Sequence, residues 1–308
     1  MFKRLMIAAA MFTAACAGKG ALPQQTTATP ARPVVGVTLL TQSHTFYKDL
    51  EDAMQAEAKI QNLDLIIVAC EMDPAKQASQ MEDFIAQKVS ALIVAPCDST
   101  AIVPYVEKAQ ASGIPVFSAD IAVNGARVTS HVASDNFAGG KLAAQTLAGL
   151  LHDRGKVLII DHPDVASVQD RTRGFDEEMK KHPGIVVVGR PSASGQRAKA
   201  MAVMEDMLQA HRDLNGVFAI NDDTALGAAS VIEAAGRRDI VIVGFDATAE
   251  AQDAIRKGGA LKADISQYPR RIGQTVVQLV ARHLRGEKVP AAVPVEVSLV
   301  NGETLKQP

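Results

Sequence analysis

The stretch from Val217 to Gly227 reads Val-Phe-Ala-Ile-Asn-Asp-Asp-Thr-Ala-Leu-Gly, an apolar run followed by a polar cluster and a helix-like segment. This order predicts a β-strand, a tight turn and the start of a helix. The same order recurs at residues 240–248, Ile-Val-Ile-Val-Gly-Phe-Asp-Ala-Thr. Because open α/β sheets bind ligands at the carboxyl ends of their strands, two such polar strand ends predict a binding cleft.

Apolar runs and helix-period segments alternate along most of the chain, from residue 34 onward. The first series has predicted strands at 34–40, 63–69, 91–95 and 114–118, and predicted helices at 47–61, 74–88 and 100–112. The second has strands at 156–161, 185–189, 216–220, 240–244 and 261–265, and helices at 138–151, 171–181, 198–212, 224–235, 249–257 and 270–285. Such alternation predicts an α/β fold of two Rossmann-like lobes, each with a parallel sheet covered by helices.

The composition excludes several classes of function. The chain has 308 residues, 47% of them hydrophobic, and a net charge of −2, which suits two globular domains and gives no basis for binding nucleic acid. The sequence contains no His-Glu-x-x-His, Gly-x-Ser-x-Gly or Walker A motif. It therefore predicts neither an enzyme of these types nor a metal or cofactor.

The N-terminus has the pattern of an export signal. Lys3 and Arg4 precede an apolar run at 5–15 that is too short to span a bilayer. Small residues before Cys16 resemble a bacterial lipobox, in which the cysteine becomes lipidated, although a Thr stands where Leu is usual. Ordinary cleavage after Ala17 is the alternative, and both predict an exported protein with a signal peptide at 1–17 and a flexible tether at 18–33.

The two cysteines of the mature chain each follow a predicted strand. Cys70 follows the run at 63–69, and Cys97 follows the run at 91–95. In a doubly wound order these strands flank the first strand and lie roughly 10 Å apart. An exported protein could pair the two cysteines, but that separation is too large for a disulfide, so we favour two semi-buried thiols.

The strand-end rule selects polar and aromatic side chains for the cleft. Asp120, Asn221 and Asp246 are the strongest candidates because each directly ends an apolar run. Carboxylates, amides and an arginine suit the hydroxyls of a polyhydroxylated ligand, and an aromatic face suits its C–H surface. The remaining candidates are His44, Phe46, Tyr47, Arg171, Phe245 and Gln267.

Structural roles compete with these assignments. A lone Asp at a strand end is often a helix N-cap, and this alternative applies most to Asp98 and Asp222. Phe46 and Tyr47 also fit packing residues at a helix start. Arg171, which opens a predicted helix, also fits a surface arginine.

Several motifs together resemble the ribose-binding type of periplasmic sugar-binding proteins that serve ABC importers. The resemblance covers residues 34 to about 300 and rests on Phe46-Tyr47-x-Asp-Leu, Asp73-Pro74-Ala75-Lys76-Gln77, Ala133-Ser134-Asp135-Asn136-x-x-Gly139-Gly140, Arg171-Thr172-Arg173-Gly174-Phe175, Asn221-Asp222-x-x-Ala225-Leu226-Gly227, Val243-Gly244-Phe245-Asp246 and Gln267-x-Pro269.

The resemblance implies a type I periplasmic binding protein fold that closes by hinge bending. The hinge segments would lie near 133–135, 265–267 and 294–297. The N-terminal lobe would then comprise 34–134 plus 268–295, and the C-terminal lobe 135–267 plus 296–305.

The resemblance also assigns roles to the candidate residues. Phe46 and Tyr47 match the aromatic pair that sandwiches the sugar, and His44 matches a polar side chain near the first strand. The other ligand contacts match Asp120, Arg171, Asn221, Phe245, Asp246 and Gln267.

The chain departs from the ribose-binding pattern in both lobes. Ile121 stands where that pattern has an arginine, and no aromatic residue lies near Ser194. An apolar side chain satisfies no hydroxyl, so a deoxy-sugar, a polyol or another small neutral polar ligand is a better expectation than ribose.

The sequence thus predicts a monomeric, periplasmic or cell-surface solute-binding protein, lipid-anchored through Cys16, that delivers a sugar-like ligand to an ABC permease in the inner membrane. A sensor that feeds a chemoreceptor or a sensor kinase is the main alternative. A Lac-repressor-type effector domain is less favoured, because a signal-like segment occupies the place of a helix-turn-helix. A cryptic enzyme is less favoured, because the catalytic motifs named above are missing from the sequence.

Overall fold

The computed structural model describes residues 32–306. The predicted signal peptide, Cys16 and nearly all of the predicted tether lie outside the described residues. None of the helices within 32–306 combines the length and apolar character needed to cross a bilayer.

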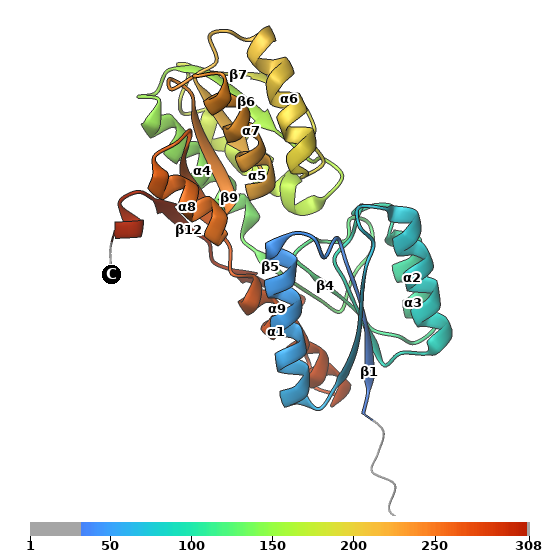
Figure 1. Cartoon of the computed structure of the whole chain (residues 1–308). Helices are drawn as coiled ribbons and strands as arrows, with labels where there is room; N and C mark the ends of the chain where they lie inside the picture. The colour runs from blue at the N-terminus through green and yellow to red at the C-terminus, as the bar shows by residue number, and fades with distance from the viewer. Residues whose placement is uncertain (1–31, 307–308) are drawn as a thin grey trace, which may run out of the picture. The chain divides into compact units, whose positions relative to one another are not determined.

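The first lobe is built on a six-stranded sheet whose strands are all parallel, in the order β11-β5-β4-β3-β1-β2. Figure 1 shows α1 and α9 packed together on one face of this sheet and α2 and α3 on the other. The elements are β1 (Val34–Leu39), α1 (Thr45–Gln61), β2 (Asp64–Ala69), α2 (Pro74–Gln87), β3 (Ala91–Val94), α3 (Val103–Ala111), β4 (Val116–Ala119), β5 (Ser130–Ser134), α9 (Pro269–Leu284) and β11 (Ala292–Val295).

The second lobe has a six-stranded sheet in the order β12-β10-β9-β8-β6-β7, in which only β12 is antiparallel to its neighbour. Helices α4 and α5 pack together, as do α6 and α7. The elements are α4 (Asn136–Leu150), β6 (Gly155–Ile160), α5 (Ala166–Met179), β7 (Ile185–Gly189), α6 (Arg197–Ala210), β8 (Gly216–Ala219), α7 (Asp222–Ala234), β9 (Val241–Asp246), α8 (Ala249–Lys257), β10 (Leu261–Ser266), β12 (Ser298–Asn301) and the 3₁₀ turn η1 (Thr304–Lys306).

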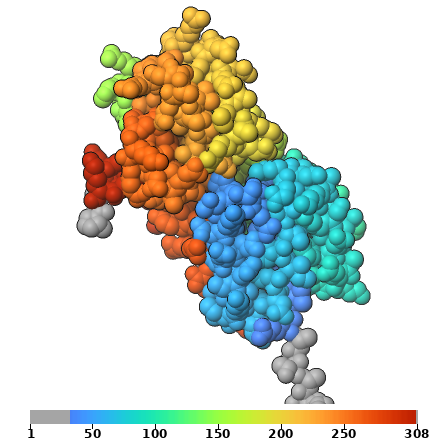
Figure 2. Space-filling view, viewed as in Figure 1, coloured from blue at the N-terminus to red at the C-terminus, as the bar shows by residue number. Residues whose placement is uncertain are grey.

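The chain passes between the two sheets three times: from β5 to α4, from β10 to α9, and from β11 to β12. In the space-filling view the lobes meet where blue and cyan surfaces touch yellow and orange ones (Figure 2). Strands β5, β11 and β12 were not expected as strands, because they are short and β5 and β11 contain exposed or polar residues.

Helix α5 begins at Ala166, five residues before the predicted start at Arg171. Val165, at the N-cap position, has no side chain that could cap the helix. The hydroxyl of Ser99 from the first lobe accepts instead from the Ala166 N–H, at 2.9 Å. A start signal supplied from the other lobe cannot be recognised in the local sequence.

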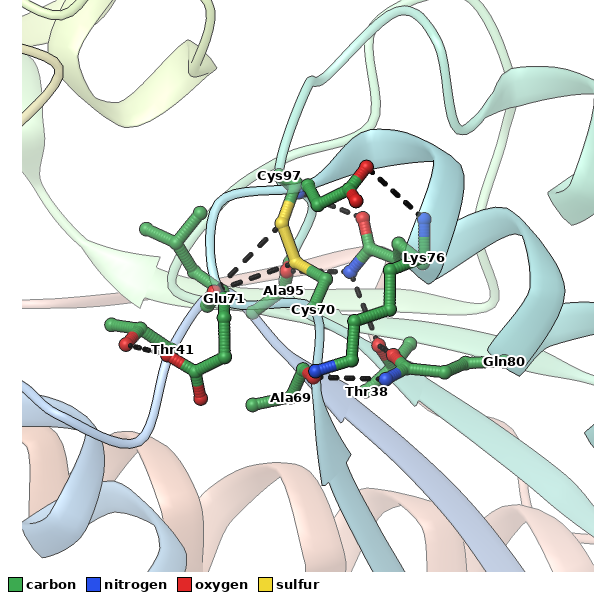
Figure 3. The surroundings of a disulfide bond; sticks show 12 residues. Thr38, Thr41, Ala69, Cys70, Glu71, Lys76, Gln80, Ala95 and Cys97 are labelled. Carbon is green, nitrogen blue, oxygen red and sulfur yellow. Dashed lines mark hydrogen bonds between the residues drawn. A yellow bond between two sulfur atoms is a disulfide. The ribbon is translucent and has the colours of Figure 1, made fainter.

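A disulfide joins Cys70 to Cys97, which contradicts the two thiols expected from the sequence (Figure 3). Their Cα atoms are 6.7 Å apart, within the range of natural disulfides. Both cysteines lie beyond the strand ends, where the two loops converge over the end of β1, so the spacing of the strands does not set the distance between them. Both sulfur atoms lie close to the Leu40 carbonyl oxygen, at 3.4 and 3.8 Å.

Candidate functional site

A cavity of about 220 Å³ opens where the carboxyl ends of strands from both sheets face each other. This volume is below the roughly 300–1,000 Å³ typical of sites for drug-sized molecules, and so suits a smaller ligand. Eight of the nine predicted site residues line it: His44, Phe46, Tyr47, Asp120, Arg171, Asn221, Asp246 and Gln267.

Asp120 is the buried acceptor on the first-lobe side of the cavity. It follows β4 in a left-handed conformation, with φ of 65°, and one carboxylate oxygen accepts from the Tyr47 hydroxyl at 2.7 Å. The other oxygen, Oδ1, is buried and has no partner among residues 32–306. Burial raises the pKa of Asp120 to about 6, although the positive charge of Arg171 opposes this rise.

Arg171 is a buried cation held in place by neutral groups. Its Nε donates to Asn136 Oδ1 at 2.8 Å and its Nη1 to the Ile220 carbonyl oxygen at 2.6 Å. The guanidinium carbon lies 3.9 Å from the centre of the Phe245 ring. Two of its five N–H groups are thus used, and the other three have no hydrogen-bond partner within 32–306.

Phe245 is the one predicted site residue that does not line the cavity. Its ring is fully buried and forms the platform on which Arg171 lies. The aromatic residue before Asp246 therefore supports the arginine in this structure, and does not face the cavity as a ligand contact would.

Asp246 and Gln267 form the acceptor pair on the second-lobe side. Gln267 Nε2 donates to Asp246 Oδ1 at 2.6 Å, which leaves the buried Gln267 Oε1 without a partner among the described residues. His44 Nε2 lies 3.5 Å from Asp246 Oδ2 and 3.6 Å from Asp223 Oδ2. Since His44 Nδ1 accepts from the Phe46 N–H, the neutral ring carries its proton on Nε2 and directs it toward these carboxylates.

The helix cap expected at Asp222 is supplied by Asn221 instead. Asn221 is the N-cap of α7, and its Oδ1 accepts from the Thr224 N–H at 3.0 Å in a capping box. Its Nδ2 donates to the Gly195 carbonyl oxygen at 3.0 Å, so the side chain is largely satisfied although it lines the cavity. Asp222, expected as the cap, is instead the buried first residue of the helix.

Phe46 and Tyr47 contact each other directly. Their ring centres are 5.2 Å apart, with planes at 75°, in an edge-to-face arrangement. No sugar fits between two rings in contact, so the expectation that this pair sandwiches the ligand is wrong for this structure. Tyr47 contributes through its hydroxyl, which holds Asp120.

Apolar side chains form another part of the cavity lining. They are Leu40, Met72, Ile121, Val165, Val168 and Ile220. Ile121 is 1% exposed and follows Asp120 directly, where the sequence pattern led us to expect a change in ligand.

Two charged residues that line the cavity, Arg197 and Asp223, were not expected from the sequence. Arg197 Nε donates to Asp223 Oδ1 at 3.1 Å, and Arg197 also pairs with Glu250. Asp223 belongs to the polar cluster after β8, which was a usable signal. Arg197 begins α6 with no motif around it, and only the fold brings it to the cavity.

The sequence matches the periplasmic binding protein domain family over residues 35–288. The chain belongs to this family. The ribose import binding protein RbsB of Salmonella typhimurium is 34% identical over 271 residues, which cover 88% of this chain and 91% of the relative. The ribose import binding protein RbsB of Bacillus subtilis is 36% identical over 266 residues, which cover 86% of each chain.

A solved structure agrees with this assignment. It is an ABC transporter solute-binding protein from Mycobacterium smegmatis with bound glycerol, 34% identical, with a TM-score of 0.84 over 89% of this chain and 96% of that one. The family and the α/β two-lobe fold expected from the sequence are confirmed. Members of this family are periplasmic substrate-binding proteins.

Proposed function

We propose that this periplasmic binding protein captures a small neutral polyhydroxylated molecule between its lobes and delivers it to the permease of an ABC importer. Polar groups of cavity-lining residues that have no partner among residues 32–306 carry the proposal. They are acceptors at Asp120 Oδ1 and Gln267 Oε1, and three donors on Arg171. A hydroxyl both donates and accepts, so adjacent hydroxyls of a sugar or polyol satisfy such a mixed set.

The ligand class follows from the size and the apolar part of the cavity. A volume of about 220 Å³ favours a monosaccharide, a deoxy-sugar or a polyol over a disaccharide. Ile121 offers no hydrogen bond to a hydroxyl, which supports a ligand with a deoxy or otherwise apolar carbon at that point. The names of the relatives, ribose import binding proteins and a protein with bound glycerol, fit this range.

We further propose that the ligand draws the lobes together by bending at the three connections between them. Asp120 and Tyr47 belong to the first lobe, whereas Arg171 and Asp246 belong to the second, so one bound molecule would engage both. We propose that the protein acts as a monomer and that the closed form is the one that the permease recognises. Size-exclusion chromatography with light scattering tests whether the protein is a monomer in solution.

Cys16 is proposed as a lipid attachment site. The small residues before it support this assignment. Mass spectrometry of the membrane fraction should show a mature N-terminus at Cys16 that carries acyl chains. A soluble mature protein that begins after Ala17 would contradict lipid attachment at Cys16, but it would still agree with export of the protein.

A thermal-shift screen over pentoses, hexoses, deoxy-sugars and polyols tests the ligand class. A ligand at about 100 times its Kd stabilises the native state by about 2.7 kcal/mol, so a true ligand raises the Tm by several degrees. Charged and apolar compounds of the same size serve as controls. A shift with one of these and with none of the sugars or polyols would refute the proposal.

Removing the hydroxyl of Ser99 should weaken the contact between the lobes. Ser99 is fully buried, and in addition to capping α5 through its hydroxyl it donates its N–H to the Asp164 carbonyl oxygen at 3.0 Å. Loss of a helix cap costs about 1 kcal/mol, so Ser99→Ala should raise the ligand Kd about fivefold in calorimetry. Ser79→Ala, on the exposed face of α2, is the matched control. Equal Kd values for both variants would show that this contact does not support closure.

Ligand binding should weaken as the pH falls through the pKa of Asp120, about 6. Because Tyr47 occupies Oδ2, the added proton goes to Oδ1 and removes the free acceptor. We expect the Kd to be nearly constant from pH 8 to 7 and to rise several-fold by pH 5 in calorimetry. Asp120→Asn should bind weakly at every pH. If His44→Gln abolished the pH dependence instead, the histidine and not Asp120 would be its source.

A further inference from the structure

Two more aspartates lie beneath the turn that carries Asp246, outside the cavity lining. Asp222 is 2% exposed and Asp264, in β10, is fully buried. Within residues 32–306 neither forms an ion pair with a basic side chain, and the charged group that faces both is Asp246. A pair of buried carboxyls without a counter-ion requires an explanation, because burial penalises the ionised form.

Each carboxyl holds one backbone N–H of the turn between β9 and α8. The Thr248 N–H donates to Asp222 Oδ2 at 2.7 Å, and the Ala247 N–H donates to Asp264 Oδ1 at 3.0 Å. These residues follow Asp246 directly. Asp246 and Ala247 have φ of 118° and 55°, a strained region for residues other than glycine. The two carboxyls therefore hold a strained turn in the conformation that presents Asp246.

The two remaining oxygens, Asp222 Oδ1 and Asp264 Oδ2, are both buried without a partner as long as both carboxyls are ionised. The two side chains are within hydrogen-bond reach of each other. A single proton between them satisfies both oxygens and removes one of two repelling charges. Gly244 makes room for this contact, since a Cβ on it would lie 2.4 Å from Asp264 Oδ2.

We propose that Asp264 keeps a proton at neutral pH and donates it to Asp222, and that this acid pair positions Asp246 for ligand binding. The proposal rests on the proposed function only in taking Asp246 as a ligand contact. Asp222 and Asp264 are positioning residues: they act on the ligand through the turn, without touching the cavity.

The electrostatics set the direction of the pH dependence. Burial and the charge of Asp246 raise the pKa of Asp222 to about 7, and burial and the charge of Asp222 raise the pKa of Asp264 well above its usual range. A raised carboxyl pKa gives stability that is present at low pH and is lost as the pH rises through the folded-state value. Asp246 in turn lies against His44 and accepts a hydrogen bond from Gln267. Stability should therefore decline from neutral to alkaline pH as the shared proton leaves.

The test compares Asp264→Asn with Asp264→Ala in the full-length mature protein. An asparagine keeps the acceptor for the Ala247 N–H and offers a permanent donor to Asp222, so it imitates the protonated acid. We expect the Tm of Asp264→Asn to equal or exceed that of the natural protein and to stay flat from pH 7 to 10, where that of the natural protein falls. Asp264→Ala should lower the Tm at every pH. Asp239→Asn, which removes a charge from an exposed ion pair with Arg237, controls for net charge.

The result that would overturn the proposal is an Asp264→Asn protein as unstable at pH 7 as Asp264→Ala, or one with the same alkaline decline as the natural protein. A second measurement links the pair to the site, with D-ribose and xylitol as calorimetric probes. Asp264→Ala should raise the Kd of a probe about tenfold, and Asp264→Asn should restore it to within about threefold. If neither probe nor any screened sugar or polyol binds the natural protein, the proposed function fails. The unfolding curves would still show whether Asp222 and Asp264 share a proton.

Discussion

Replacing Arg171 by alanine is expected to abolish ligand binding while the protein remains folded. The change removes three cavity donors and the positive charge that opposes the rise in the pKa of Asp120. A hydrogen bond from a charged donor is worth about 1.5–3 kcal/mol, so losing two or more of them to the ligand corresponds to a Kd at least two orders of magnitude higher. Calorimetry with a ligand from the screen measures this loss.

Arg173→Ala is the matched control, because Arg173 lies two residues along the same helix with its side chain 65% exposed. It should leave the Kd unchanged. Arg171→Lys keeps the charge but cannot reach Asn136 and the Ile220 carbonyl oxygen in the same geometry, so it should recover only part of the affinity. If the Kd of Arg171→Ala were within threefold of that of the natural protein, Arg171 would not be a ligand contact.

Replacing Gly140 by alanine is expected to be strongly destabilising. Helices α4 and α5 cross so closely that a Cβ on Gly140 would lie 1.9 Å from the Arg171 carbonyl oxygen, and one on Gly174 would lie 2.1 Å from that of Phe137. Because the obstacle is backbone, the helices must separate, at a cost of about 3 kcal/mol or more. Thermal unfolding followed by circular dichroism should show a Tm lower by several degrees, with weakened ligand binding, since α5 carries Arg171.

Gly149→Ala provides an internal control in the same helix. No atom lies within 4 Å of a Cβ at that position, so the change should be neutral or stabilise the protein by up to about 1 kcal/mol. If Gly140→Ala and Gly149→Ala unfolded at the same temperature, the close helix crossing would not limit stability.

The sequence predicted the features that repeat or that obey a local rule. The alternation of apolar runs and helix-period segments identified the two α/β series, and the strand-end rule found Asp120 and Asp246, which lie across the cavity from each other. The glycines at 140 and 174 were noted only as parts of motifs, although the helix crossing explains both.

Features that depend on contacts between distant segments were missed. The start of α5 could not be recognised because its capping hydroxyl, from Ser99, lies 67 residues away. Phe245 was assigned to the ligand because sequence order does not reveal which face of β9 it occupies relative to Arg171. The helix cap was expected at Asp222 because either side chain can cap a helix, and only the structure shows that Asn221 caps α7 while Asp222 is buried.

The disulfide ties the maturation of the binding site to the compartment in which the protein resides. Cys70 is followed by Glu71 and Met72, both in left-handed conformations with φ of 52° and 64°, and Met72 lines the cavity. Disulfides persist in oxidising compartments and are rare in the reducing cytoplasm. A chain kept in the cytoplasm would carry two thiols instead, and the loop that brings Met72 to the cavity would lack this restraint.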